Sequence, residues 1–121
     1  MISGLDHINI NTKRLEETRR FFVDILGFDV GPRPDFGVPG YWLRRGGTDI
    51  VHLLEIGDGR EGVLGALDHF AFRVSDHQAM KAHLERHDIP YMLFEMPDGS
   101  RKSLTIKDPN GVTIELNWRA P

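Results

Sequence analysis

The sequence contains no cysteine among its 121 residues. Disulfides, thiolate catalysis, iron–sulfur clusters and cysteine-ligated zinc sites are therefore excluded. No apolar run approaches the roughly 20 residues that a membrane helix requires. The net charge of −3 offers no basic surface for nucleic acid or for an anionic membrane. We expect no nucleic-acid or membrane partner, and any metal must be bound by histidine and carboxylate side chains.

The first residues lack the features of an exported protein. Met1 to Gly4 provide neither the basic nor the apolar region of a signal peptide. Together with the absence of cysteine, this predicts a cytoplasmic protein. The length, with 40% hydrophobic and 27% charged residues, suits one globular domain over residues 1–121.

A short pattern occurs twice in the chain. The segment LDHINI at 5–10 resembles LDHFAF at 67–72, and VHL at 51–53 resembles IEL at 114–116. The two matches follow the same order, and their separations in the two halves differ by a single residue. This pattern indicates a duplicated module rather than a chance match.

We predict one module at about 1–58 and a second at about 66–121, joined by the polar, glycine-rich segment 57–62. Each module has the pattern of a strand, a helix and three further strands. The first helix is expected at 13–26, and the second begins at Ser75 with an S-x-x-Q capping box and ends near His87. The expected strands are 5–10, 28–30, 41–45 and 49–55, then 67–74, a strand beginning near 91, 103–107 and 112–117.

Side chains alternate between the two faces of a strand. In four of the predicted strands one face is apolar, and the opposite face carries a histidine or a carboxylate at the repeat-equivalent position. Histidine and carboxylate bind Fe, Zn, Mn, Ni or Co without cysteine. We therefore predict one divalent metal site, in a cup formed by the polar faces. Its predicted ligands are His7, His52, His69 and Glu115.

Other polar residues have a weaker pattern. Glu55 shares the parity of the apolar residues in its strand and is left out of the site. His83 and His87 are four residues apart on a helix, but no third ligand lies near them in the sequence. With His77, they are expected to face solvent. The glycine- and proline-rich loop 31–40 is either a lid over the site or a rigid connection, and its aromatic neighbours suit an apolar pocket.

These motifs, together with DPNGVTIEL at 108–116, resemble the vicinal oxygen chelate superfamily. That superfamily includes glyoxalases, fosfomycin- and bleomycin-resistance proteins, extradiol dioxygenases and methylmalonyl-CoA epimerases. The resemblance extends over essentially the whole chain. It implies an α+β fold in which two βαβββ modules form a cupped mixed sheet around a divalent metal, with the helices on the outer face, and it implies a homodimer. His7, His69 and Glu115 match the usual ligands, and His52 matches a position where glyoxalases carry glutamate.

The resemblance implies a metal-dependent enzyme of the glyoxalase or dioxygenase type. Its ion would chelate two neighbouring oxygens of a small organic substrate and stabilise an enolate, alkoxide or catecholate. Two histidines and one carboxylate suit Fe(II) and O₂. With His52 as a fourth ligand, the remaining positions suit a lyase, isomerase or transferase. Off the metal, His52 becomes a candidate general base. His52 and Glu115 are the candidate catalytic residues.

Two other functions remain open from the sequence. One is a metal-free, drug-binding protein of the bleomycin-resistance kind, and the other is a non-catalytic domain that binds a partner. Metal-free members of the superfamily lack the ligands that this chain keeps, so the enzyme is the preferred hypothesis.

Overall fold

The computed structural model describes residues 1, 5, 7–56 and 69–121. The chain divides into two compact units, Met1–Glu61 and Gly62–Pro121, and each is described by itself. The predicted connecting segment 57–62 and the predicted start of the fifth strand at 67 and 68 lie outside the described residues.

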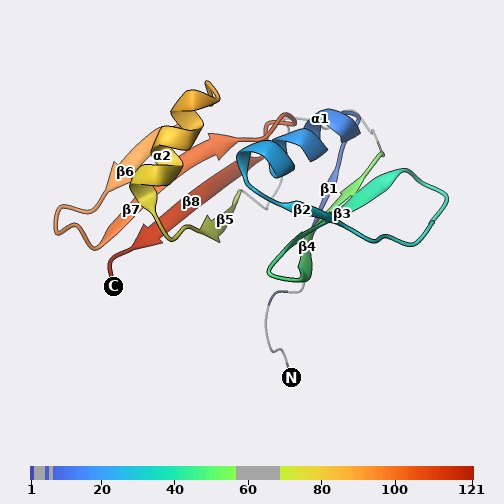
Figure 1. Cartoon of the computed structure of the whole chain (residues 1–121), viewed down its shortest axis with the longest axis horizontal. Helices are drawn as coiled ribbons and strands as arrows, with labels where there is room; N and C mark the ends of the chain where they lie inside the picture. The colour runs from blue at the N-terminus through green and yellow to red at the C-terminus, as the bar shows by residue number, and fades with distance from the viewer. Residues whose placement is uncertain (2–4, 6, 57–68) are drawn as a thin grey trace. The chain divides into compact units, whose positions relative to one another are not determined.

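Unit 1 contains one helix and a four-stranded sheet (Figure 1). The strands lie in the order β1-β4-β3-β2, with β1 parallel to β4 and the other neighbours antiparallel. Its elements are β1 (Ile8–Asn11), α1 (Leu15–Arg20), the π-helical turn η1 (Phe21–Ile25), β2 (Asp29–Gly31), β3 (Gly40–Arg45) and β4 (Thr48–Leu54).

Unit 2 repeats this arrangement. Its strands lie in the order β5-β8-β7-β6, with β5 parallel to β8. Its elements are β5 (His69–Arg73), α2 (His77–Arg86), β6 (Met92–Glu95), β7 (Arg101–Lys107) and β8 (Thr113–Arg119). The predicted α+β fold of two βαβββ modules, each with a mixed sheet, is therefore confirmed.

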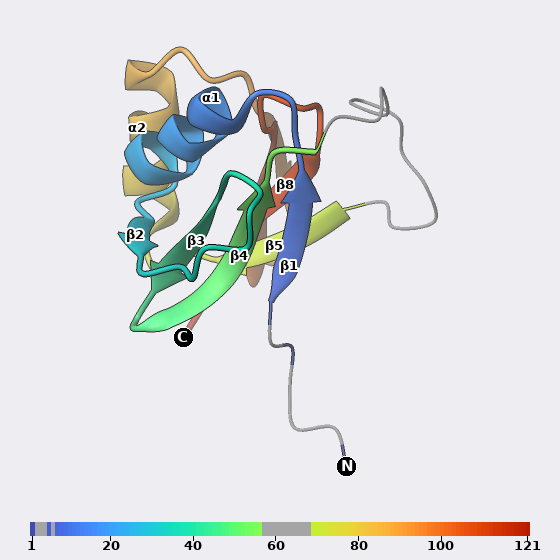
Figure 2. The same ribbon diagram turned by 90° about the vertical axis from the view of Figure 1, so that its right-hand side faces the viewer.

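The apolar face of each sheet was predicted correctly from the alternation of side chains. In unit 1, Ile10 of β1 lies beside Leu53 of β4, and both are buried. Helix α1 lies along one side of this sheet (Figure 2). Phe22, which follows α1, is fully buried and meets the ring of Phe28 edge-on at 5.6 Å between ring centroids. Burial of such side chains is the main contribution to the stability of the unit.

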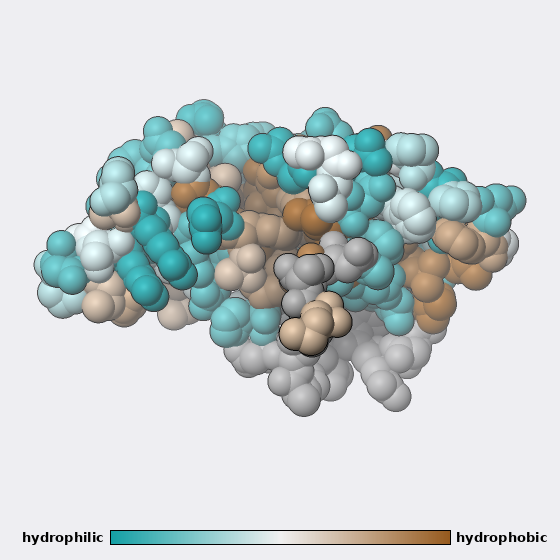
Figure 3. Space-filling model, turned by 90° about the horizontal axis from the view of Figure 1, so that it is seen from below, coloured by the Kyte–Doolittle hydropathy of each residue, from teal (hydrophilic) through white to brown (hydrophobic). Residues whose placement is uncertain are grey.

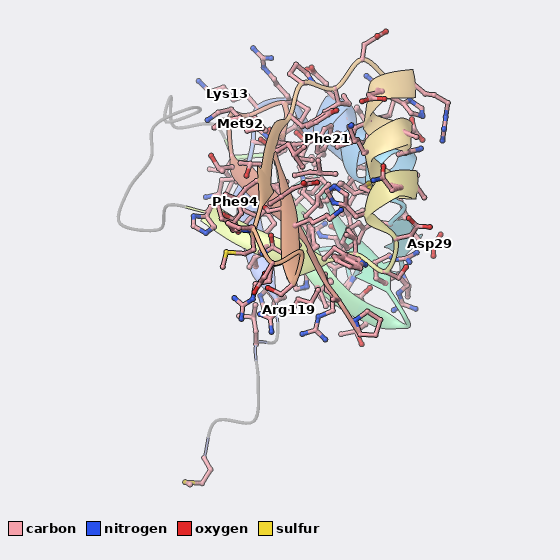
Figure 4. All side chains as sticks on the ribbon, turned by 90° about the vertical axis from the view of Figure 1, so that its left-hand side faces the viewer. Lys13, Phe21, Asp29, Met92, Phe94 and Arg119 are labelled. Atoms are coloured by element: carbon pink, nitrogen blue, oxygen red, sulfur yellow. The ribbon has the colours of Figure 1, made fainter. Side chains whose placement is uncertain are left out.

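In unit 2 the same alternation separates a helix-covered face from an open one. Leu104 of β7 and Leu116 of β8 are paired and buried, and Leu84 of α2 is buried with them. Met92 and Phe94 of β6 lie on the side turned away from α2 (Figure 4), and they are 75% and 57% exposed. Hydrophobic residues also reach the surface among hydrophilic ones in the view of Figure 3.

The helices differ from the sequence prediction in detail. The first begins at Leu15, because the hydroxyl of Thr12 accepts from the amide of Arg14 and turns the chain ahead of the helix. The second is capped by Asp76, whose carboxylate accepts from the amide of Ala79 at 2.9 Å, so the prediction of Ser75 as the cap is wrong. His77 then begins the helix on its buried side.

Candidate functional site

The two predicted histidines of unit 1 lie together on the open face of its sheet. His7 directly precedes β1, and His52 is in β4. Their rings are stacked, with centroids 3.9 Å apart and planes 16° apart. Trp42 of β3 also stacks with His52, at 4.7 Å and 12°. Because β4 lies between β1 and β3, the ring of His52 is held between those of His7 and Trp42.

This stacking limits how the pair can bind an ion. The metal-binding lone pair of an imidazole lies in the plane of its ring. Two planes that are 16° apart and stacked at 3.9 Å converge only at more than about 10 Å, far beyond a metal–nitrogen bond of about 2.0–2.1 Å. In this arrangement, therefore, only one of the two imidazoles can bind a given ion.

Unit 2 provides an imidazole and a carboxylate that do converge. His69 begins β5, Glu115 lies in β8, and the distance from His69 Nε2 to Glu115 Oε1 is 3.5 Å. Two ligand atoms at that separation, each about 2.1 Å from one ion, subtend an angle near 110° at the ion. Their side chains are 41% and 31% exposed, so the pair is open to solvent. It fits a divalent ion in both donor type and spacing.

Strand register explains why these residues correspond between the units. Asn9 of β1 lies beside His52 of β4, and Ala71 of β5 lies beside Glu115 of β8. His7 and His69 are each two residues before these positions. His52 and Glu115 therefore occupy equivalent places in the two sheets, as the repeat in the sequence predicted.

The hairpin that carries Glu115 is fixed by a buried aspartate. The Asp108 carboxylate accepts from the amides of Asn110 at 2.8 Å and Val112 at 2.9 Å, and Gly111 completes the turn with a positive φ of 81°. Burial raises the pKa of the Asp108 carboxyl, while these hydrogen bonds act in the opposite direction. This fixed turn sets the register that places Glu115 in β8.

Asn117 is a candidate site residue that the sequence motifs did not reveal. It lies two positions after Glu115 on the same face, and its Nδ2 donates to Glu115 Oε2 at 3.2 Å. That bond leaves Oε1 directed at His69. Partners of this kind orient the ligands of metal sites. The period of two in a strand was the signal that could have identified it.

A pocket of about 310 Å³ lies beside His52 in unit 1. Phe36 and Trp42 provide its aromatic wall, with ring centroids 6.0 Å apart. The pocket also includes Arg33, which the sequence analysis did not single out. Its other lining residues are Asn9, Val38, Leu53 and Leu54.

The histidines of α2 do not form a comparable site. The rings of His83 and His87 lie 4.5 Å apart. His77 is only 4% exposed, so the prediction that it faces solvent is wrong. Within the ranges that the structure describes, neither unit by itself contains a group of three or more histidine, aspartate or glutamate residues suited to a metal. A single metal site formed by His7, His52, His69 and Glu115 therefore stays a prediction.

Fold and donor groups together define an α+β protein of two repeated βαβββ modules, each with a pair of metal-ligand residue types on its open face. A comparison with protein families matches residues 4–116 to the Glyoxalase/Bleomycin resistance protein/Dioxygenase superfamily. The chain belongs to this superfamily, as the sequence motifs indicated.

Solved structures with this fold include enzymes and binding proteins. The fosfomycin resistance protein FosX from Listeria monocytogenes matches with a TM-score of 0.80 and 19% identity, over 99% of this chain and 96% of its own. Lactoylglutathione lyase from Agrobacterium tumefaciens matches with a TM-score of 0.73 and 20% identity, over 98% of this chain and 95% of its own. TnmS3, an antibiotic binding protein from Streptomyces sp. CB03234, matches with a TM-score of 0.75 and 21% identity, over 98% of each chain. At these identities the likeness shows the fold alone.

A search of curated proteins found no match. Among the described residues, no helix has the length and apolar character needed to cross a membrane.

Proposed function

We propose that the protein is a metal-dependent enzyme of the glyoxalase or dioxygenase type that acts on a small organic substrate with neighbouring oxygen atoms. His69 and Glu115 hold a divalent ion together with a histidine of unit 1. The observation that carries this proposal is the 3.5 Å separation of His69 Nε2 and Glu115 Oε1, with Glu115 held by Asn117. Fe, Zn, Mn, Ni and Co all accept such ligands.

His7 is the proposed ligand from unit 1, and His52 is the proposed general base. The stacked rings support this division, because the two lone pairs do not converge on one ion. His52 is also clamped by Trp42 and lines the pocket beside it. A base in that position lies next to bound substrate, as proton transfer requires. The assignment of His52 as a fourth ligand remains the alternative from the sequence.

Each group then has a distinct task. When bound, the ion would supply Lewis-acid stabilisation of negative charge on substrate oxygen. His52 accepts the substrate proton, Asn117 keeps the Glu115 carboxylate oriented, and the aromatic wall of the pocket excludes water around the substrate. Removing the ion or the base is expected to abolish turnover, whereas removing Asn117 weakens metal affinity by about 10- to 100-fold.

Metal analysis tests the proposed ligands. The protein is stripped with chelator, reloaded with each of the five metals in turn, desalted and measured by mass spectrometry of the metal. Wild type is expected to retain about one ion per chain, and Glu115→Gln and His69→Ala to retain almost none. Glu95→Gln is the matched control, because Glu95 pairs with Lys102 on another strand. Less than about a tenth of an equivalent in wild type for every metal would overturn the proposal.

The variant His52→Phe distinguishes a general base at this position from a metal ligand. His52→Phe keeps a ring between His7 and Trp42 but removes both nitrogens. We expect it to retain the ion and lose turnover, measured by oxygen uptake with catechols and by ultraviolet absorbance with thiohemiacetals of α-ketoaldehydes. Loss of the ion in this variant would instead identify His52 as a ligand.

The pocket of unit 1 supports a second candidate function, metal-free binding of a drug-like molecule. Its aromatic wall suits such a ligand, and TnmS3 is an antibiotic binding protein with the same fold. Wild type that holds no ion but binds a small molecule would favour this function. We also propose a homodimer, which light scattering after size-exclusion chromatography would reveal as twice the chain mass.

A further inference from the structure

The pocket beside His52 contains both an aromatic wall and a cation. Its volume of about 310 Å³ lies at the lower end of the range for small-molecule sites, which suits a ligand of one or two rings. Such a volume is too small for a peptide segment. The chemistry of the lining residues therefore indicates the class of ligand.

Four rings of unit 1 lie in a row, and the distance between neighbouring rings increases toward the pocket. Centroids are 3.9 Å apart from His7 to His52, 4.7 Å from His52 to Trp42, and 6.0 Å from Trp42 to Phe36. The last two rings are also tilted by 41°, whereas the earlier pairs are nearly parallel. The rings of His7, His52 and Trp42 are therefore stacked in contact, whereas a wedge-shaped gap separates Trp42 from Phe36.

A small movement of Phe36 would open this wedge to a ligand ring. A ring inserted between two others needs about 7 Å, twice the usual stacking distance of about 3.5 Å. Phe36 lies in the loop between β2 and β3 and is 58% exposed, so a shift of about 1 Å, together with rotation of its ring out of the 41° tilt, meets little packing resistance. Trp42 is fixed by its strand and by His52, and provides the rigid side of the clamp.

Arg33 gives the pocket its charge. Its guanidinium carbon lies 5.1 Å from the centre of the Phe36 ring, and the side chain is half-buried against Gly40. Among the described residues, no carboxylate lies within ion-pair distance of Arg33. By contrast, Arg44 in the same unit is paired with Asp49 at 2.9 Å. A guanidinium fork held over one ring of an aromatic pair is suited to a planar anion.

We propose that this pocket binds a planar aromatic carboxylate, with the ring between Phe36 and Trp42 and the carboxylate on Arg33. The inference rests on the proposed function in placing this ligand beside His52 as the substrate class. Ligand binding itself is measured on protein without metal, so failure of the pocket and failure of the metal site are separate results.

Benzoate is the probe, and the indole N–H signal of Trp42 in a ¹H–¹⁵N spectrum is the readout. The chain has two tryptophans, and Trp118→Phe identifies which signal belongs to Trp42. Measurements are made with chelator present. We expect a saturable shift of the Trp42 signal, with cyclohexanecarboxylate and benzylamine binding at least about tenfold more weakly.

Two variants separate the parts of the clamp. Arg33→Gln and Phe36→Leu are each expected to weaken benzoate binding by about tenfold or more, because a charge-assisted bond or a stacked ring is lost. Arg86→Gln, an exposed arginine on α2, is the matched control and should bind as wild type does. The same spectra confirm that each variant is folded.

The proposal is overturned by any of three results. One is the lack of a saturable shift with benzoate up to about 20 mM. The others are equal binding of benzoate and cyclohexanecarboxylate, and unchanged benzoate affinity in Arg33→Gln. Metal content of the same samples after reloading reports on the proposed function independently.

Discussion

His77 is predicted to make the protein less stable as the pH falls. It is 4% exposed, and among the described residues its Nδ1 has no hydrogen-bond partner. Burial lowers the pKa of His77, and the nearby Lys102 ammonium lowers it further, while Glu95 acts in the opposite direction. The unfolded chain, with an ordinary pKa of about 6.5, therefore takes up this proton more readily than the folded chain.

The sign of the effect follows from proton linkage. The contribution of His77 to the free energy of unfolding is fully present above about pH 6.5 and is lost as the pH falls through the unfolded value toward the lower folded one. His77→Leu removes the titrating group and its unpaired nitrogen. We expect it to raise the free energy of unfolding by about 1 kcal/mol at pH 7, since an unpaired buried polar group costs about 1–3 kcal/mol. The gain should be larger at pH 5.

Urea unfolding followed by circular dichroism at pH 5, 6 and 7 checks this prediction. His87→Leu, at the exposed residue that directly follows α2, is the matched control, and it should follow wild type at every pH. The reasoning is refuted if wild type and His77→Leu lose the same stability between pH 7 and pH 5.

Two further predictions concern the framework that holds the site. Phe22→Ala should lower the free energy of unfolding by about 3–5 kcal/mol, because it empties a fully buried position; a loss below about 1 kcal/mol in urea unfolding would contradict this. Asp76→Ala should cost about 1 kcal/mol in the same assay and Ser75→Ala less than about 0.5 kcal/mol, since Asp76 caps α2; equal losses would show that the cap is misassigned.

Much of the fold was predictable because the sequence pattern repeats and alternates. An apolar residue at every second position of a strand must face the core, so Val51, Leu53, Ile114 and Leu116 were placed correctly. The same period predicted that His52 and Glu115 lie on the other face of their strands, opposite to these apolar residues. The turn at 108–111 also has a clear chemical signal, an aspartate followed by asparagine and glycine, and the buried Asp108 carboxylate accepts from the amides of Asn110 and Val112.

Other features depend on geometry that no short sequence pattern specifies. Ser75 and Asp76 are both good helix caps, and only the path of the chain into α2 selects Asp76. That choice also turns His77 toward the core. The stack of His7, His52 and Trp42 depends on the register of three strands, and Arg33 reaches the pocket from a loop whose conformation has no period.

The central claim is that histidine and glutamate from the two repeated modules hold one divalent ion. A crystal structure of zinc-loaded protein, with anomalous diffraction recorded at the zinc edge, tests it most directly. We predict one strong peak per chain within about 2.0–2.2 Å of His69 Nε2, a Glu115 oxygen and a nitrogen of His7, with His52 still stacked on Trp42. A fully loaded crystal with no peak at His69 and Glu115 would contradict the account.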